Sequence, residues 1–131
     1  MESTANLRTS LKAILEEKKG ERRVLVLYGR ENGPHQIIEQ QEILHPKDIA
    51  EGMAERDLDV IVLVGYTLPE PDRWFLTHSE FKLVPSEDFQ GWLLGKDGEI
   101  KHTFKQVMQP DELFKLIDSM PMRKDEMKKK S

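Results

Sequence analysis

The sequence predicts an α/β domain in which a four-stranded mixed sheet, in the spatial order 2-1-3-4, carries helices on both faces. Two observations indicate this class. Two short apolar runs rich in β-branched residues, 24–28 and 59–65, are separated by a segment of helical periodicity, which is typical of a parallel βαβ unit. Further along, the period changes to that of an antiparallel hairpin, and an amphipathic segment closes the domain.

Length and composition fit a single domain with an ordinary hydrophobic core. The chain has 131 residues, 37% of them hydrophobic and 34% charged, which is enough to bury a core without disulfides or a metal. It contains no cysteine. This absence excludes a disulfide framework, a thiolate zinc site, a cysteine nucleophile and dithiol redox chemistry.

The chain has no sequence feature of export or membrane insertion. Residues 1–20 are polar and charged, so they lack the apolar core of a signal peptide. No stretch reaches the roughly 18 apolar residues of a membrane span. We therefore expect a soluble protein, cytoplasmic as the sequence is written, with an exported protein whose signal peptide is missing from this sequence as the alternative.

The first half of the chain predicts three helical pieces and the first strand. Apolar residues at helical spacing predict an amphipathic helix over 4–19, ended by Gly20. Residues 24–28 form a continuous apolar run, as expected for a central strand buried on both faces. Pro34 opens the next helix. A further helical piece over 46–56 completes either one kinked helix or two short ones.

The second half predicts the remaining strands and the closing helix. Residues 59–65 indicate a second buried strand, and 66–90 indicate loops with one short helix near 72–81. Two apolar runs, 91–94 and 100–104, flank an Asp-Gly turn typical of a hairpin. Residues 110–120 then form an amphipathic helix that Pro121 stops.

The charge is unevenly distributed. The net charge is −4, yet residues 123–131 carry five Lys and Arg against two Asp and Glu. We expect one domain over 1–122 and a basic, frayed tail over 123–131. No aromatic residue is interleaved with this tail, so we expect no nucleic-acid partner.

The order of these elements is that of a thioredoxin-like domain. Thioredoxins place Cys-Gly-Pro-Cys after the first strand, where this chain has Asn32, Gly33, Pro34 and His35. The chain therefore resembles a thioredoxin without its redox pair. Thioredoxins also have a cis-proline directly before the third core strand, whereas Pro85 stands several residues ahead of the predicted one. The resemblance does not carry over the peptide-substrate groove.

Two motifs near the end of the chain resemble a narrower family. They are a Gly-Lys-Asp-Gly turn and an Ile-Asp-Ser-Met-Pro-Met-Arg ending, with the signature residues Gly95, Lys96, Asp97, Gly98, Asp118, Met120, Pro121, Met122 and Arg123. Over residues 22–127 the chain is similar to the thioredoxin-like domain of unknown function found in small bacterial proteins and in animal sushi-repeat and related extracellular-matrix proteins. The resemblance implies a structural role for these residues and assigns no activity.

The loop after the first strand is the candidate ligand-binding site. A helix that begins after a central strand offers free N–H groups and a positive dipole end to an anion. The residues that could surround such an anion are Tyr28, Arg30, Asn32, Gly33 and His35. The alternative is that Gly33 and Pro34 only start the helix. We expect no metal site and no cofactor, because the four histidines fall on four different elements.

These observations predict a redox-inactive, non-enzymatic domain for binding or assembly, with an unidentified protein partner. One alternative is a domain that binds a small anion or other ligand through residues 28–36. A second is a homodimer formed through the sheet edge or through the methionine-rich ending, where Met120, Met122 and Met127 either contact a partner or complete the core.

Overall fold

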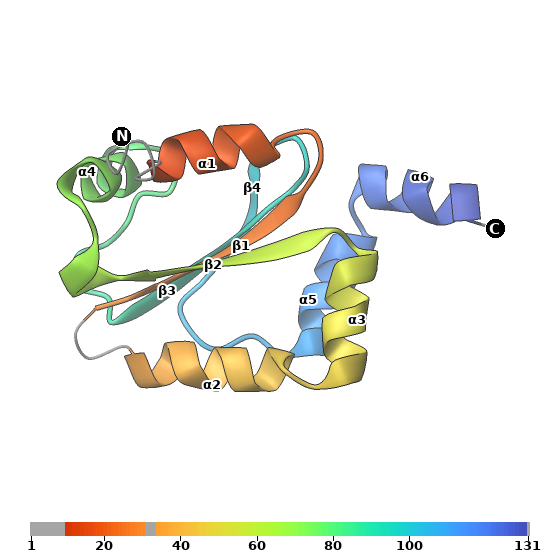
Figure 1. The fold of residues 1–131 in the computed structure, drawn as a ribbon, viewed down its shortest axis with the longest axis horizontal. Coiled ribbons are helices and arrows are strands. Elements are labelled where there is room, and N and C mark those ends of the chain that lie inside the picture. Colours follow the sequence, from red (N-terminus) through yellow and green to blue (C-terminus); the bar gives the residue numbers. More distant parts are fainter. Residues whose placement is uncertain (1–9, 31–33, 131) are drawn as a thin grey trace, which may run out of the picture.

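The computed structural model describes residues 10–30 and 34–130. Within them the chain forms the predicted α/β fold, a four-stranded sheet between two layers of helices (Figure 1). The elements in order are α1 (Leu11–Lys18), β1 (Arg23–Gly29), α2 (Pro34–Leu44), α3 (Lys47–Glu55), β2 (Leu58–Val64), the short 3-10 turn η2 (Gly65–Thr67), α4 (Glu70–His78), β3 (Phe89–Leu94), β4 (Ile100–Phe104), α5 (Pro110–Asp118) and α6 (Pro121–Lys130).

The sheet has the predicted order β2-β1-β3-β4. Strand β1 runs parallel to β2 and antiparallel to β3, and β3 and β4 form the predicted antiparallel hairpin. The hairpin turn contains Gly98 at φ +84°, a conformation that glycine adopts without the steric cost of a side chain. These findings confirm the thioredoxin-like topology expected from the order of the elements.

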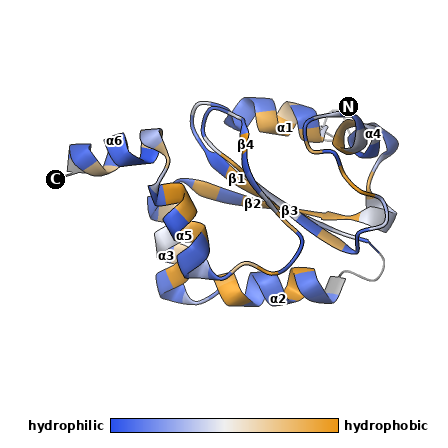
Figure 2. Ribbon diagram, turned by 180° about the vertical axis from the view of Figure 1, so that it is seen from behind, coloured by the Kyte–Doolittle hydropathy of each residue, from blue (hydrophilic) through white to orange (hydrophobic). Residues whose placement is uncertain are grey.

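Strand β1 is the centre of the fold, because every one of its residues is buried. Leu25 and Leu27 point into one apolar cluster, which α2, α3 and α5 cover. Val26 and Tyr28 point into the other, which α1 and α4 cover. In Figure 2 the hydrophobic colour runs along the strands, whereas α6 is largely hydrophilic.

Two polar contacts join segments distant in the sequence: α2 to the loop after β4, and β3 to the loop after α4. The buried side chain of Gln40 on α2 donates to the carbonyl of Met108 and accepts from its N–H, both at 2.8 Å. On the opposite face, Nε1 of Trp92 donates to the carbonyl of Phe81 at 3.0 Å. Both contacts satisfy groups that would otherwise be buried without a partner.

The structure sharpens several predicted boundaries. The first predicted helix, 4–19, covers Leu11–Lys18 in the described residues, and residues 4–9 lie outside them. The helix is interrupted at His45 and Pro46, so α2 and α3 are two separate helices. Helix α4 begins and ends earlier than the predicted 72–81, because Pro71 lies in its first turn, where proline is tolerated.

Two predictions about exposure differ from the structure. Strand β2 was expected to be buried, but most of its residues are half-exposed because it lies at the sheet edge. Residues 123–131 were expected to be a frayed tail, but Pro121 starts helix α6 and the side chain of Arg123 is buried. The boundary expected after residue 122 therefore divides a helix. Helix α6 is attached to the domain by ion pairs with residues distant in the sequence, which the local charge pattern does not reveal.

Replacing Gly91 tests how closely β3 packs against the neighbouring edge strand β4. A Cβ atom at Gly91 would lie 2.1 Å from Cζ of Phe104, so neither strand can accommodate it without moving. We expect Gly91→Ala to lower the free energy of unfolding by about 1–3 kcal/mol, as overpacked cores do. Urea denaturation measures this change. The double variant Gly91→Ala with Phe104→Leu should recover part of the loss, and no difference between Gly91→Ala and the unmodified protein would contradict the packing.

Candidate functional site

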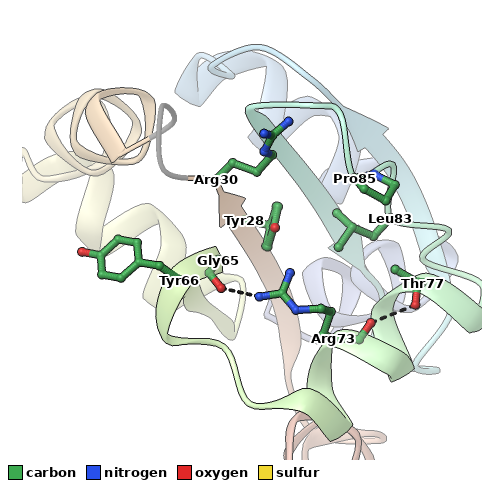
Figure 3. Close-up of a pocket in the computed structure, with 8 residues that line it drawn as sticks. All are labelled: Tyr28, Arg30, Gly65, Tyr66, Arg73, Thr77, Leu83 and Pro85. Atoms are coloured by element: carbon green, nitrogen blue, oxygen red, sulfur yellow. Dashed lines mark hydrogen bonds between the residues drawn. The ribbon is translucent and has the colours of Figure 1, made fainter.

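A pocket opens where β1 and β2 end at their carboxyl ends. It has a volume of about 350 Å³ and is lined by Tyr28, Arg30, Gly65, Tyr66, Arg73, Thr77, Leu83 and Pro85 (Figure 3). These residues come from the end of β1, from η2, from α4 and from the loop before β3. In sheets with parallel strands, ligands bind outside the carboxyl ends of the strands, which is where this pocket lies.

The side chain of Tyr28 brings a hydroxyl group to the pocket. The Tyr28 side chain is 2% exposed, and its hydroxyl has no hydrogen-bond partner among the described residues. This oxygen lies so close to the backbone of Gly65 that a Cβ atom there would be 2.9 Å away. The phenol therefore carries a donor that protein groups in the described part of the chain leave unused.

Two arginines bring positive charge to the same pocket. Arg73 donates one hydrogen bond to the carbonyl of Gly65, which leaves most of its donors unused. Arg30 is half-buried, and neither arginine forms an ion pair with a carboxylate in the described residues. In Figure 3 the guanidinium of Arg73 is directed toward Tyr28, whereas the ring of Tyr66 extends away from it.

The sequence predicted part of this pocket. Tyr28 and Arg30 do line it, whereas His35 is exposed on the first turn of α2 and is not a lining residue. Asn32 and Gly33 lie outside the described residues. Sequence reasoning missed Arg73, because it lies in the irregular stretch after β2. The carboxyl end of the second parallel strand was the signal that could have located Gly65 and Tyr66.

The family-signature residues gather at the opposite end of β1. The turn after β3 and the start of α6 form a crevice of about 140 Å³, lined by Arg23, Gly95, Lys96, Asp97, Lys101, Met120, Pro121 and Met122. The two motifs are therefore adjacent in space, although they are separated in the sequence. Met120 is buried and completes the core, whereas Met122 and Met127 are exposed.

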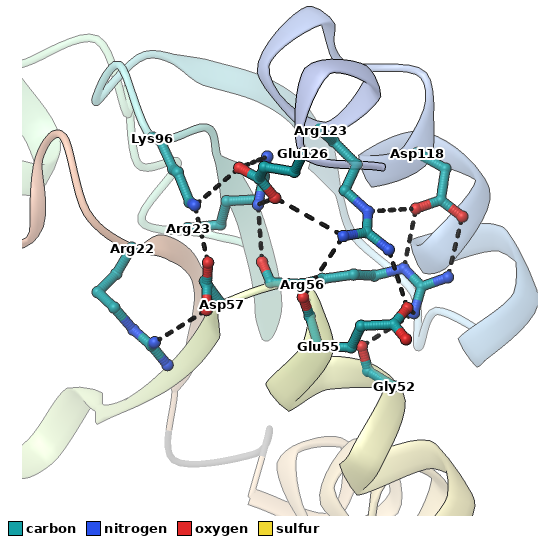
Figure 4. Close-up of polar contacts among 10 residues, drawn as sticks. All are labelled: Arg22, Arg23, Gly52, Glu55, Arg56, Asp57, Lys96, Asp118, Arg123 and Glu126. Carbon is teal, nitrogen blue, oxygen red and sulfur yellow. Dashed lines mark hydrogen bonds and ion pairs between the residues drawn. The ribbon is translucent and has the colours of Figure 1, made fainter. Parts of the chain in front are cut away.

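A chain of ion pairs joins these signature residues to the sheet (Figure 4). Arg23, at the start of β1, is fully buried; its guanidinium donates to Glu126 on α6 at 3.0 Å and to the carbonyl of Arg56 at 2.8 Å. Lys96 contacts Glu126 at 2.7 Å and Asp57 at 2.8 Å. Asp57 also contacts Arg22 at 3.4 Å, so it belongs to this network.

The second half of the network holds the first turn of α6. Arg123 donates to Asp118 at 3.1 Å and to Glu55 at 2.9 Å, and Arg56 donates to both oxygens of Asp118. Burial works against the charged form of Asp118, but the two arginines outweigh it and lower its pKa. This arrangement neutralises buried charge and attaches α6. It presents no unpaired carboxylate to a substrate.

One family model matches most of the chain. The model of the domain of unknown function DUF4174 matches residues 14–126. This range includes both signature motifs and every residue that lines the pocket at the carboxyl end of β1. The chain belongs to this family. No curated protein matches the sequence. The expected resemblance to a thioredoxin-like domain of unknown function is thereby confirmed.

Solved structures place this DUF4174 chain in the thioredoxin-like fold. The reduced 2-Cys peroxiredoxin of Plasmodium vivax aligns with a TM-score of 0.56 and 14% sequence identity, over 85% of this chain and 72% of the peroxiredoxin. At this identity the match shows the fold alone. This DUF4174 chain has no cysteine.

The described part of this DUF4174 domain contains neither a cluster of metal ligands nor a membrane-spanning helix. No group of three or more His, Asp or Glu side chains lies close enough to hold a metal ion there. No helix among residues 10–30 and 34–130 is long and apolar enough to cross a membrane.

Neutralising Glu126 tests whether the ion pairs stabilise the fold. Burial opposes ionisation of Glu126, but hydrogen bonds from Arg23 and Lys96 lower its pKa from 4.5 to about 2. Because the folded-state pKa is lowered, ionised Glu126 stabilises the protein above pH 4.5, and this contribution disappears as the pH falls toward 2. We expect Glu126→Gln to cost about 2 kcal/mol at pH 7, because it leaves buried Arg23 without its counter-charge.

Urea denaturation at pH 7 and at pH 3 measures this contribution. The stability difference between the Glu126→Gln variant and the unmodified protein should shrink at the lower pH. The matched control is Asp125→Asn, an exposed carboxylate on the same helix, which should change stability by less than about 0.5 kcal/mol. Equal losses for the two variants would contradict the role of Glu126.

Proposed function

We propose that this DUF4174 chain is a redox-inactive binding domain that holds the negatively charged group of a small ligand in the pocket at the carboxyl end of β1. The observation that carries the proposal is that the hydroxyl of Tyr28, Arg30 and Arg73 line one pocket and have donors that no described protein group uses. An anion can accept hydrogen bonds from such donors.

The positive charge of the pocket favours a negatively charged ligand. Arg30 and Arg73 supply two positive charges, and no described residue that lines the pocket is acidic. Guanidinium groups bind carboxylate and phosphate oxygens through paired hydrogen bonds. The volume of about 350 Å³ lies at the lower end of the roughly 300–1,000 Å³ range of small-molecule sites. Leu83 and Pro85 add an apolar wall, which suits an organic acid or a phosphate ester.

The same residues favour binding over catalysis. No described lining residue is a histidine, an aspartate or a glutamate, the usual general acids and bases. The hydroxyl of Thr77 donates back to the carbonyl of Arg73 within α4. It also lies 2.9 Å from Nδ1 of His78, whose ring stacks on Trp74 and does not line the pocket. The absence of cysteine removes thiol chemistry. These features support a domain that binds its ligand without transforming it.

Anion titration tests the proposal. Inorganic phosphate, sulfate and citrate are added to the isotopically labelled protein, and amide chemical shifts are followed by NMR. We expect saturable shifts at Gly65, Tyr66 and Arg73. The Arg30→Gln variant should weaken binding about tenfold, because one charged hydrogen bond is worth roughly 1.5–3 kcal/mol. Tyr28→Phe should weaken it less, by about fivefold, because a neutral hydrogen bond is lost.

The controls separate a specific site from general charge attraction. Lys47 is exposed at the start of α3 and lies outside the pocket, so Lys47→Gln should leave the affinity unchanged. Arg30 makes no side-chain hydrogen bond to a described residue, so its replacement should leave the urea midpoint unchanged. Shifts that never saturate, or equal losses in Arg30→Gln and Lys47→Gln, would refute the pocket as an anion site.

A further inference from the structure

We propose that strand β2 is a self-association edge, through which two copies of this chain pair antiparallel about a two-fold axis at Val62. The sheets of the two copies would then form one continuous sheet. This inference does not depend on anion binding, since it rests on the backbone and apolar side chains of residues 60–64, none of which lines the pocket.

The backbone of β2 is open on one side. Among the described residues β2 pairs only with β1, so the N–H and C=O groups along its outer side lack strand partners. Soluble proteins normally protect such an edge with charge, proline or a bulge. Residues 60–64 contain none of these: they read Val-Ile-Val-Leu-Val, and their pairing with β1 has no register shift.

The side chains of β2 are incompletely buried on both faces. Val60, Val62 and Val64 pack against the cluster beneath α2, α3 and α5. Ile61 and Leu63 pack against the cluster beneath α1 and α4. All five remain half-exposed, because nothing described lies on the outer side of the strand. A further strand would extend both apolar layers at once.

The strand is complementary to a second copy of itself. Antiparallel pairing centred on Val62 places Val60 opposite Val64 and Ile61 opposite Leu63. Each apolar row therefore meets the same kind of row on the same face of the sheet. No like charges oppose each other across this register.

The carboxylate at the start of β2 is already neutralised within the chain. Asp59, which would lie opposite Gly65 of the second copy, forms ion pairs with Lys18 and Arg22, both at 2.7 Å. It therefore brings no unpaired negative charge to the register. The occupant follows from the register itself, because pairing about Val62 matches both apolar rows with identical rows of a second copy.

Light scattering after size-exclusion chromatography tests the association. A short strand interface is smaller than the roughly 1,200–2,000 Å² of stable complexes, so we expect a dimer that dissociates at concentrations on the order of 10–100 µM. Val62→Lys places two positive charges directly opposite each other and should yield a monomer. The matched control Ile38→Lys changes an exposed residue on α2 and should leave the dimer intact.

Cysteine cross-linking tests the register. Because the chain has no cysteine, each single-cysteine variant carries one thiol at a known position. Directly opposed residues have Cα atoms about 4.5–5.5 Å apart, within reach of a disulfide. The Val62→Cys variant should therefore form a covalent dimer on oxidation. Ile61→Cys and Leu63→Cys should cross-link when mixed with each other, and far less when each is alone.

Each outcome decides the proposal. A dimer that is abolished by Val62→Lys and cross-linked in this register supports it. A monomer at all concentrations, with no cross-linking of Val62→Cys, overturns it, and so does a dimer that Val62→Lys leaves intact. If Val62→Lys lowers the urea midpoint sharply, the cross-linking pattern decides alone. Anion binding by Arg30 is measured separately, so the two proposals can fail independently.

Discussion

The burial of β1 on both faces is the constraint on which the rest of the structure depends. A strand whose residues are all buried needs a helical layer above and below it and a hydrogen-bonded strand on either side. The βαβ connection supplies β2, and the hairpin supplies β3. Strand β3 is enclosed in the same way, but it is at the two ends of β1 that the core meets clusters of polar side chains. Both sites of the molecule lie at those ends: the ion-pair network at Arg23 and the pocket at Tyr28.

The two ends handle polar groups in opposite ways. At the amino end, buried Arg23 is matched by Glu126, and each neighbouring cation also has a carboxylate partner. One atom is an exception, Nε of Arg23, which is buried without a partner. At the carboxyl end, the cations of the pocket have no carboxylate partner among the described residues. Complete charge pairing is typical of a structural attachment, whereas unpaired donors in a cavity are typical of a binding site.

The sequence predicted the fold more completely than the sites. The strands were identifiable because residues 24–28 and 60–64 are continuous apolar runs, and the Asp-Gly turn before Ile100 is a local signal. The pocket was only half predicted: Tyr28 and Arg30 follow directly from the end of the first strand. Arg73 comes from a helix whose place over β2 depends on the packing of the whole α1–α4 layer, and no local pattern encodes it.

The sequence by itself determined that the chain has no thiol chemistry, and it determined the order of the helices and strands. Both follow from local properties, the cysteine content and the period of the hydrophobic residues. Only the tertiary structure decided which of the two parallel strands became the edge, and that Arg123 and Glu126 belong to the body of the domain. The physical reason is the same in both cases. Exposure and ion pairing depend on residues that are distant in the sequence. Such residues come close in space only when both helical layers close over β1.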